Sequence, residues 1–157
     1  MRNRKKVVTS DLMPLRVGID LVEIKKIRKT FERGGELKER VFTAAELRSS
    51  FGQKDPYISL AALFAIKEAV FKALGTGLSG SMDWREVEVQ WAASGTPLLR
   101  LCGETARMAH ELGVTRHALS MSRTREYGVA VVLFEGSPTE GPASEKGLIS
   151  VRLSSSP

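Results

Sequence analysis

Glu68 and Lys72 are charged side chains in a segment that otherwise reads as an apolar helix ending at a glycine turn. They stand four residues apart, so on a helix they face each other at the edge of an apolar stripe. Six large side chains form this stripe: Leu60, Leu63, Phe64, Val70, Phe71 and Leu74. Lys67 falls in its middle. Because a buried charge is costly unless it is paired, liganded or used, we interpret this helix as one wall of a functional site.

Asp20 supplies a second carboxylate, at the end of an apolar segment that predicts a buried strand over residues 15–21. Carboxylates without neighbouring His or Cys suit Mg²⁺, which typically takes one or two of them together with water and substrate phosphates. Asp20 and Glu68 are therefore candidate ligands of a magnesium site. The spacing alone favours a structural alternative, in which Asp20 caps the following helix and Glu68 pairs with Lys72.

Two further segments could contact a phosphate-containing ligand. The turn Gly75-Thr76-Gly77 leaves the backbone free to approach a ligand closely, although a glycine there could equally be a plain helix cap. Ser120 and Ser122 precede Arg123, Thr124 follows it, and Arg suits bidentate contacts with anions. A solvated turn is an equally good interpretation. The phosphate-loop pattern of nucleotide triphosphatases is absent.

The elements that would position these residues alternate between helices and antiparallel strands. Helices are expected over about residues 23–33, from residue 43, over 57–74 and over 103–112. Strands are expected over residues 15–21, 86–91, 98–101, 118–122 and 128–134. The last four strands form two hairpins, because turn residues separate each pair. The pattern predicts an α+β fold, a single domain in which helices pack with an antiparallel sheet.

Composition narrows the class of protein. The 157 residues are 42% hydrophobic and 27% charged, which fits one globular domain. The net charge of +6 suits an acidic partner, such as a nucleic acid, a nucleotide-like cofactor or an acidic protein. With Cys102 as its single cysteine the chain cannot form an internal disulfide, and we expect a cytoplasmic location. No apolar run approaches the roughly 20 residues needed to cross a bilayer, so no membrane association is expected.

The chain divides into three expected parts. Residues 1–13 form a flexible basic extension without the apolar segment of a signal peptide. Residues 14–135 form the domain, and residues 136–157 form a tail rich in Ser, Pro and Gly.

Four segments in this order resemble one family, the holo-[acyl-carrier-protein] synthases, which are small bacterial 4′-phosphopantetheinyl transferases. Residues 17–24 read VGIDLVEI, and residues 39–47 fit the family pattern E-R-x-x-T-x-x-E-L. Residues 64–77 fit F-A-x-K-E-A-x-x-K-A-x-G-T-G, and residues 119–130 resemble the final hairpin. The resemblance spans about residues 15–135 and therefore the whole expected domain.

The resemblance implies an enzyme that moves the 4′-phosphopantetheine arm of coenzyme A onto a serine of apo acyl carrier protein. Adenosine 3′,5′-bisphosphate would be released, in the course of fatty acid biosynthesis. Asp20 and Glu68 match the Mg²⁺ ligands, Glu68 is the candidate acceptor of the serine proton, and Lys72 matches a lysine that assists at the phosphates. The expected coenzyme A contacts are Lys72, Gly75, Thr76, Gly77, Ser120, Ser122 and Arg123.

The resemblance also implies partners. Acyl carrier proteins are acidic, and the helix over residues 23–33 is basic, so we expect Lys26, Arg33 and Arg40 to contact the carrier. The family assembles as trimers that share sites between neighbours, so we expect a homotrimer.

Two departures from the family keep a second interpretation open. Arg123 replaces the family's histidine and cannot accept a proton near neutral pH, and Leu63 replaces an arginine. The alternative is a coenzyme A-binding or carrier-binding module of the same fold with little catalysis. Nucleic-acid binding would rest on the net charge alone, because no aromatic-rich basic face supports it, and we expect no nucleic-acid partner.

Overall fold

The structure, a computed structural model, describes residues 15–33, 36–78 and 80–137. Its elements in chain order are β1 (Leu15–Glu23), α1 (Ile24–Arg33), α2 (Leu37–Val41), α3 (Ala44–Phe51), α4 (Pro56–Leu74), the 3₁₀ helix η2 (Trp84–Glu86), β2 (Val87–Trp91), β3 (Pro97–Leu101), α5 (Gly103–Glu111), β4 (Val114–Arg123) and β5 (Tyr127–Gly136). The predicted extension over residues 1–13 and all but the first two residues of the predicted tail lie outside the described residues.

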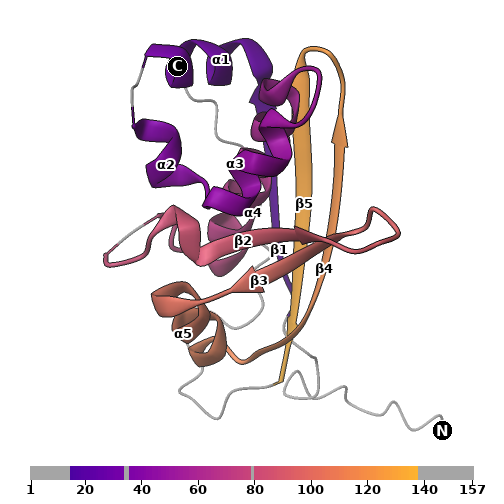
Figure 1. Ribbon diagram of the computed structural model, residues 1–157. Helices are drawn as coiled ribbons and strands as arrows, with labels where there is room; N and C mark the ends of the chain where they lie inside the picture. The colour runs from indigo at the N-terminus through magenta and orange to yellow at the C-terminus, as the bar shows by residue number, and fades with distance from the viewer. Residues whose placement is uncertain (1–14, 34–35, 79, 138–157) are drawn as a thin grey trace, which may run out of the picture.

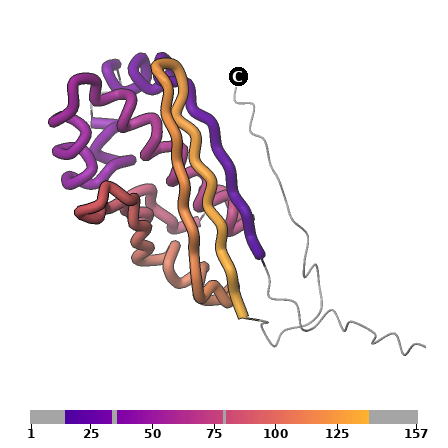
Figure 2. The backbone as a smooth tube through the Cα atoms, turned by 90° about the vertical axis from the view of Figure 1, so that its right-hand side faces the viewer, coloured from indigo at the N-terminus to yellow at the C-terminus, as the bar shows by residue number. Residues whose placement is uncertain are grey.

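The described strands form two antiparallel sheets. β5 lies between β1 and β4 in a three-stranded sheet, while β2 and β3 pair as a separate hairpin (Figure 1). Figure 2 shows the helices gathered on one side of the three long strands, so that no helix of the described residues lies on the other face of the sheet. This arrangement confirms the predicted α+β domain with an antiparallel sheet.

Helix α4 is the central element of the core, and its local sequence defines both ends. The Asp55 side chain accepts a hydrogen bond from the Tyr57 N–H at 3.0 Å, and Pro56 occupies the first turn, where a missing N–H costs nothing. Gly75 ends the helix in the left-handed region with φ +82°, which favours glycine. The helix therefore begins one residue earlier than the predicted 57–74 and ends where predicted.

Two glycines allow the sheet to pack directly on the backbone of α4. A Cβ added to Gly18 of β1 would lie 1.8 Å from the carbonyl oxygen of Ala69. A Cβ added to Gly128 of β5 would lie 2.8 Å from the backbone nitrogen of Ala62. Contacts this close leave no room for a side chain, so β1 holds a fixed position along the C-terminal half of α4.

The sequence patterns missed two short elements, α2 and η2, because neither is long enough to show helical periodicity. The structure also extends three predicted strands: β1 continues to Glu23, β4 begins at Val114, and β5 ends at Gly136. Pairing with β5 fixes these ends, since Glu23 pairs with Tyr127 and Val114 with Gly136. The side chains of β4 are mostly exposed, so its polar start shows no pattern of burial.

Candidate active site

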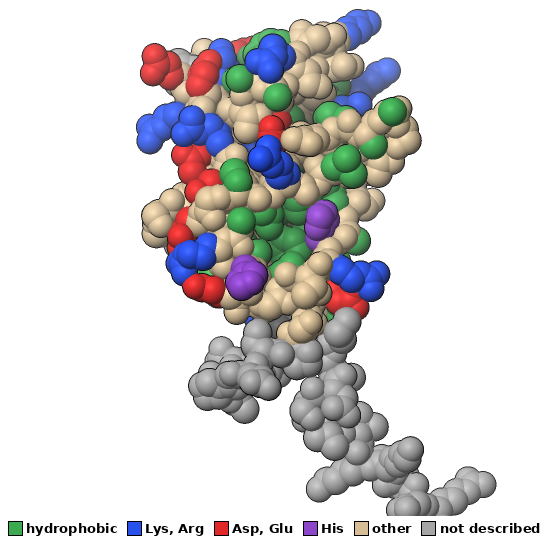
Figure 3. All heavy atoms as spheres, turned by 60° about the horizontal axis from the view of Figure 1, so that its bottom comes forward, with side chains coloured by type: hydrophobic (Ala, Val, Ile, Leu, Met, Phe, Trp, Pro, Cys, Tyr) green, Lys and Arg blue, Asp and Glu red, His purple; other side chains and the backbone are tan. Residues whose placement is uncertain are grey.

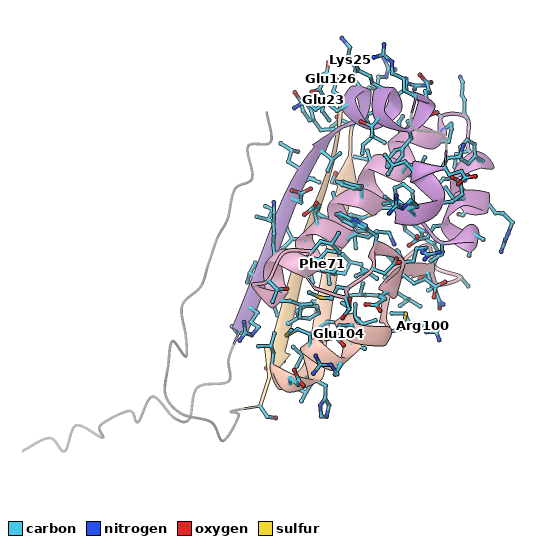
Figure 4. The ribbon with its side chains drawn as sticks, turned by 90° about the vertical axis from the view of Figure 1, so that its left-hand side faces the viewer. Glu23, Lys25, Phe71, Arg100, Glu104 and Glu126 are labelled. Carbon is cyan, nitrogen blue, oxygen red and sulfur yellow. The ribbon has the colours of Figure 1, made fainter. Side chains whose placement is uncertain are left out.

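Asp20 and Lys72 meet where β1 packs against α4. Lys72 Nζ donates a hydrogen bond to Asp20 Oδ1 at 2.7 Å, and the Asp20 side chain is only 7% exposed. The structural alternative for Asp20 is therefore wrong: it lies inside β1, and its described contact is with a helix 52 residues away in sequence. The first N–H of α1, that of Ile24, instead donates to the carbonyl oxygen of Glu126 at 2.8 Å. Figure 4 shows Glu126 beside Glu23 at this end of the molecule.

Glu68 is half-buried on α4 beside this pair. Burial raises the pKa of its carboxyl above the ordinary value of 4.5, the negative charge of Asp20 raises it further, and the positive charge of Lys72 lowers it. Two carboxylates that repel each other in a partly desolvated site attract either a proton or a cation. Asp20, Glu68 and Lys72 therefore form one charged cluster, as the sequence predicts.

A cavity of about 500 Å³ adjoins the two carboxylates. Its apolar lining comes mainly from α1, α2, α4 and η2: Ile27, Phe31, Leu37, Val41, Phe64 and Trp84. Asp20 and Glu68 are part of the same lining. A pocket with apolar walls and a few charged groups at one side is the usual form of a small-molecule site.

Trp84 is a pocket residue that the sequence patterns did not single out. Its ring stacks on Phe64 with centroids 5.0 Å apart and meets Phe71 edge-on at 5.3 Å. Figure 4 shows Phe71 in the interior between the sheet and the β2–β3 hairpin. The local sequence feature that points to a turn at Trp84 is the preceding residue, Asp83. Its side chain accepts a hydrogen bond from the N–H of Arg85 at 2.8 Å and so begins the short helix η2.

Lys67, the charge in the middle of the predicted stripe, does not point into this cavity. It is fully buried and pairs with Glu46 of α3 at 3.0 Å. Its ammonium also donates to the carbonyl oxygens of Trp84, at 3.1 Å, and of Val87. Lys67 is thus a structural tie between α4, α3 and the η2–β2 segment, and burial lowers its pKa although Glu46 opposes the shift.

The two carboxylates are the donor set that this site offers to a metal. Among residues 15–33, 36–78 and 80–137, no three His, Cys, Asp or Glu side chains group closely enough to hold an ion by themselves. Two oxygen ligands that leave most positions to water and substrate phosphates are the usual protein share of a Mg²⁺ site. Asp20 and Glu68 fit that share, and the pKa of Glu68 is raised first by burial and then by the negative charge of Asp20, which a bound cation would offset.

The glycine turn Gly75-Thr76-Gly77 begins three residues after Lys72. Both glycines have positive φ, +82° and +62°, and the N–H of Gly75 bonds the carbonyl oxygens of Phe71 and Lys72. Thr76 Oγ1 donates to the carbonyl oxygen of Gly77 at 2.9 Å. The turn is a helix cap and is also exposed, so its backbone is accessible to a ligand.

The predicted phosphate contacts on β4 do not join the cluster within one chain. Asp20 lies opposite Ala130, and Ala130 lies opposite Met121, so these three share the sheet face that packs on α4. Ser120 and Ser122 alternate with Met121 and therefore point to the opposite, open face. Arg123 points toward α4, where its Nη1 donates to Ser59 Oγ at 3.1 Å.

The basic residues predicted for carrier contact lie on α1 and α2. Lys26 and Arg33 line an open hollow with Lys29 and Thr30, and Lys26 also lines the main cavity. Arg40 is exposed on α2 and lines neither hollow. The cationic surface of α1 is therefore continuous with the entrance of the cavity.

The two histidines are surface residues that contact neither hollow. His110 ends α5 and His117 lies in β4, and both are exposed. Figure 3 shows the two histidine side chains (purple) at the surface on either side of an apolar area. No described helix is both long and apolar enough to cross a membrane.

Comparison with known sequences gives a consistent result. Residues 16–132 match the family model of the 4′-phosphopantetheinyl transferase superfamily. The holo-[acyl-carrier-protein] synthase of Desulforudis audaxviator is 44% identical over 129 residues, which cover 82% of this chain and 97% of that protein. The synthase of Moorella thermoacetica is 40% identical over 126 residues, covering 80% and 98%.

Solved structures show the same likeness in three dimensions. The holo-[acyl-carrier-protein] synthase of Neisseria meningitidis aligns with a TM-score of 0.69 and 32% identity, over 76% of this chain and 97% of that one. A synthase from Bacillus anthracis, solved in complex with coenzyme A (3′,5′-ADP), aligns with a TM-score of 0.66 and 30% identity, over 80% and 100%. The chain therefore belongs to the holo-[acyl-carrier-protein] synthases of the 4′-phosphopantetheinyl transferase superfamily.

Proposed function

We propose that this protein transfers the 4′-phosphopantetheine group of coenzyme A to a serine of apo acyl carrier protein, within fatty acid biosynthesis. The observation that carries the proposal is the cluster of Asp20, Glu68 and Lys72 at the edge of the cavity. Membership of the family supplies the reaction, and the cluster supplies the acid–base and phosphate-binding groups that the reaction requires.

Asp20 and Glu68 would hold Mg²⁺ in this function. A Mg²⁺ ion held by these two carboxylates would supply positive charge to offset the negative charge of the substrate phosphates. The fit rests on the charge of the site, where Lys72 pairs with Asp20 at 2.7 Å and a second carboxyl, that of Glu68, lies beside them. Lys72 is thereby held at the metal side of the cavity, where it can approach a phosphate oxygen.

The reaction forms one phosphorus–oxygen bond and breaks another. The carrier serine oxygen attacks the phosphorus that bears pantetheine, and the bond to the bridging pyrophosphate oxygen breaks to release adenosine 3′,5′-bisphosphate. Glu68 accepts the serine proton, directly or through a water molecule. Its raised pKa makes it a stronger base than an exposed glutamate once it is ionised. The glycine turn would offer backbone N–H groups to the nucleotide.

The open face of the sheet supports a homotrimer that shares its sites. This face exposes large apolar side chains, including Leu21 at 61% and Val131 at 38%. Ser120 and Ser122 lie on it as well, so they can serve as coenzyme A contacts only for a neighbouring protomer. Burial of this face between copies would cover the apolar surface and complete each site at once.

The acidic carrier protein would dock on α1, where Lys26 and Arg33 surround the open hollow, with Arg40 nearby on α2. Complementary charge of this kind mainly accelerates encounter, and added salt should weaken it. We also propose a cytoplasmic location, where the carrier and coenzyme A are both found.

Release of adenosine 3′,5′-bisphosphate tests this function directly. The nucleotide, followed by chromatography, should appear only when protein, coenzyme A, Mg²⁺ and apo carrier are all present. Omission of the carrier controls for simple hydrolysis of coenzyme A. Binding of coenzyme A without any release would favour the alternative of a binding module, for which Arg123 in place of histidine would be the first residue to exchange.

A further inference from the structure

Arg28 of α1 contacts the first turn of α4 in two ways. Its Nη2 donates a hydrogen bond to Asp55 Oδ2 at 2.7 Å, although the two residues are 27 positions apart in sequence. Its guanidinium also lies over the ring of Tyr57, with Cζ 4.5 Å from the ring centroid. Both contacts depend on the plane of the guanidinium, so together they hold this side chain in one geometry.

Asp55 uses a different oxygen for each of its two contacts. Oδ2 accepts the hydrogen bond from Arg28, while Oδ1 accepts that from the Tyr57 N–H at 3.0 Å and so caps α4. The residue that defines where α4 begins therefore also fixes a point of α1 against it. Since Glu68 lies on α4, the ion pair relates the position of α1 to the candidate site.

The apolar side chains of α1 leave space on the side of the helix that faces the cavity. Ile27 and Phe31 are buried, but both border the cavity of about 500 Å³. On a helical wheel, Arg28 and Lys26 lie on opposite sides of these two residues. A rotation of α1 that turned Lys26 into the cavity would therefore pull Arg28 away from α4. The ion pair between Arg28 and Asp55 opposes this rotation.

We propose that Arg28, held by Asp55, is a positioning residue for carrier recognition: it fixes the orientation in which α1 presents its cations to an acidic carrier protein. The inference rests on the proposed function and adds a pair of residues outside the expected carrier contacts. Lys26 and Arg33 line the open hollow on α1, and their attraction for a carboxylate depends on distance. A rotated α1 would displace both cations while Glu68, on α4, stayed in place. The ion pair thus acts on binding of the carrier, and coenzyme A binding and the chemical step do not depend on it.

Transfer kinetics with the two substrates varied separately test this role. Arg28→Met and Asp55→Ser each remove the ion pair, and serine retains a cap on α4. We expect each variant to raise the KM for apo acyl carrier protein about two- to fivefold, the effect available from one partly exposed ion pair. The KM for coenzyme A and kcat should stay at their wild-type values. The double variant should be no worse than Arg28→Met, because the two residues act as a unit.

The charge of Asp55→Ser separates positioning from direct contact. This change makes the surface beside α1 more positive, so a carrier attracted by net charge alone would bind more tightly. A lowered or unchanged carrier KM for Asp55→Ser, with a raised one for Arg28→Met, would mean that Arg28 contacts the carrier itself and would overturn the positioning role. Arg100→Met is the matched control, because it removes one positive charge and an ion pair with Glu88 on the β2–β3 hairpin. It should change neither KM.

The outcomes also separate this role from the proposed function. Wild-type protein that transfers phosphopantetheine, together with variants that keep the wild-type carrier KM, would reject the positioning role and leave the function intact. A lowered kcat or a raised KM for coenzyme A in Asp55→Ser would reject it as well, since the ion pair would then support the fold as a whole. Wild-type protein that transfers nothing would reject the function and the positioning role with it.

Discussion

At the residue scale, burial and the charge of Asp20 both raise the pKa of Glu68, and Lys72 offsets them only in part. A carboxyl whose pKa is higher in the folded state than in the unfolded chain stabilises the fold only while it is protonated. Its contribution is present below the unfolded pKa and is lost as pH rises through the raised folded pKa. The ionised Glu68 that catalysis needs is therefore a local cost in the absence of metal.

Glu68→Gln should consequently stabilise the metal-free protein near neutral pH. The difference in free energy of unfolding from wild type should be small near pH 4 and should grow as pH rises through the raised pKa of Glu68. Urea denaturation at a series of pH values, with a chelator present, measures it. Glu32→Gln on the exposed face of α1 is the control. A constant difference at every pH would show that folding does not shift the pKa of Glu68 and would contradict this account.

At the element scale, the approach of β1 to α4 sets the distance between Asp20 and Lys72. Gly18→Ala would place a methyl group 1.8 Å from the backbone oxygen of Ala69. We expect a loss of at least about 1–3 kcal/mol in stability, as in overpacked cores, together with a lower transfer rate. Thermal denaturation and the transfer assay measure the two effects. Gly52→Ala, where the nearest atoms lie at 3.5 Å and φ is −75°, should be tolerated; equal behaviour of both variants would contradict the close packing.

The same scale shows what the sequence could and could not predict. The limits of α4 follow from Asp55, Pro56 and Gly75, because capping is a local property. The hairpins follow from alternation and turn residues. The partner of Lys67 does not follow from its sequence, since Glu46 reaches it only after α3 and α4 pack. The wheel places Lys67 in the apolar stripe without identifying a partner, and the structure shows it paired with Glu46 in the core.

In the candidate site, too, the local sequence predicts some features and tertiary packing determines the others. Family motifs identified Asp20 and Glu68, and the helical spacing placed Lys72 near Glu68. The ion pair between Lys72 and Asp20 depends on the packing of β1 on α4, which no local pattern encodes. Trp84 was missed for that reason, since it acquires its place from tertiary contacts.

At the scale of the whole molecule, the open sheet face is the surface that most needs a partner. Val131→Glu would place a charge in the middle of the proposed interface. We expect a folded monomer by light scattering and a transfer rate reduced at least about tenfold, because Ser120 and Ser122 could no longer reach a neighbouring site. Leu98→Glu, exposed on the separate β2–β3 hairpin, should remain a trimer. A Val131→Glu trimer would place the interface elsewhere.

The mass of the carrier protein tests the central claim most directly. Apo acyl carrier protein incubated with this protein, coenzyme A and Mg²⁺ should gain one phosphopantetheine by mass spectrometry. Asp20→Ala, Glu68→Ala and a metal-free sample should each lose the gain by at least about a hundredfold in rate. Circular dichroism confirms that both variants are folded. Wild-type protein that leaves the carrier unmodified, or a Glu68→Ala variant that transfers at the wild-type rate, would contradict the account.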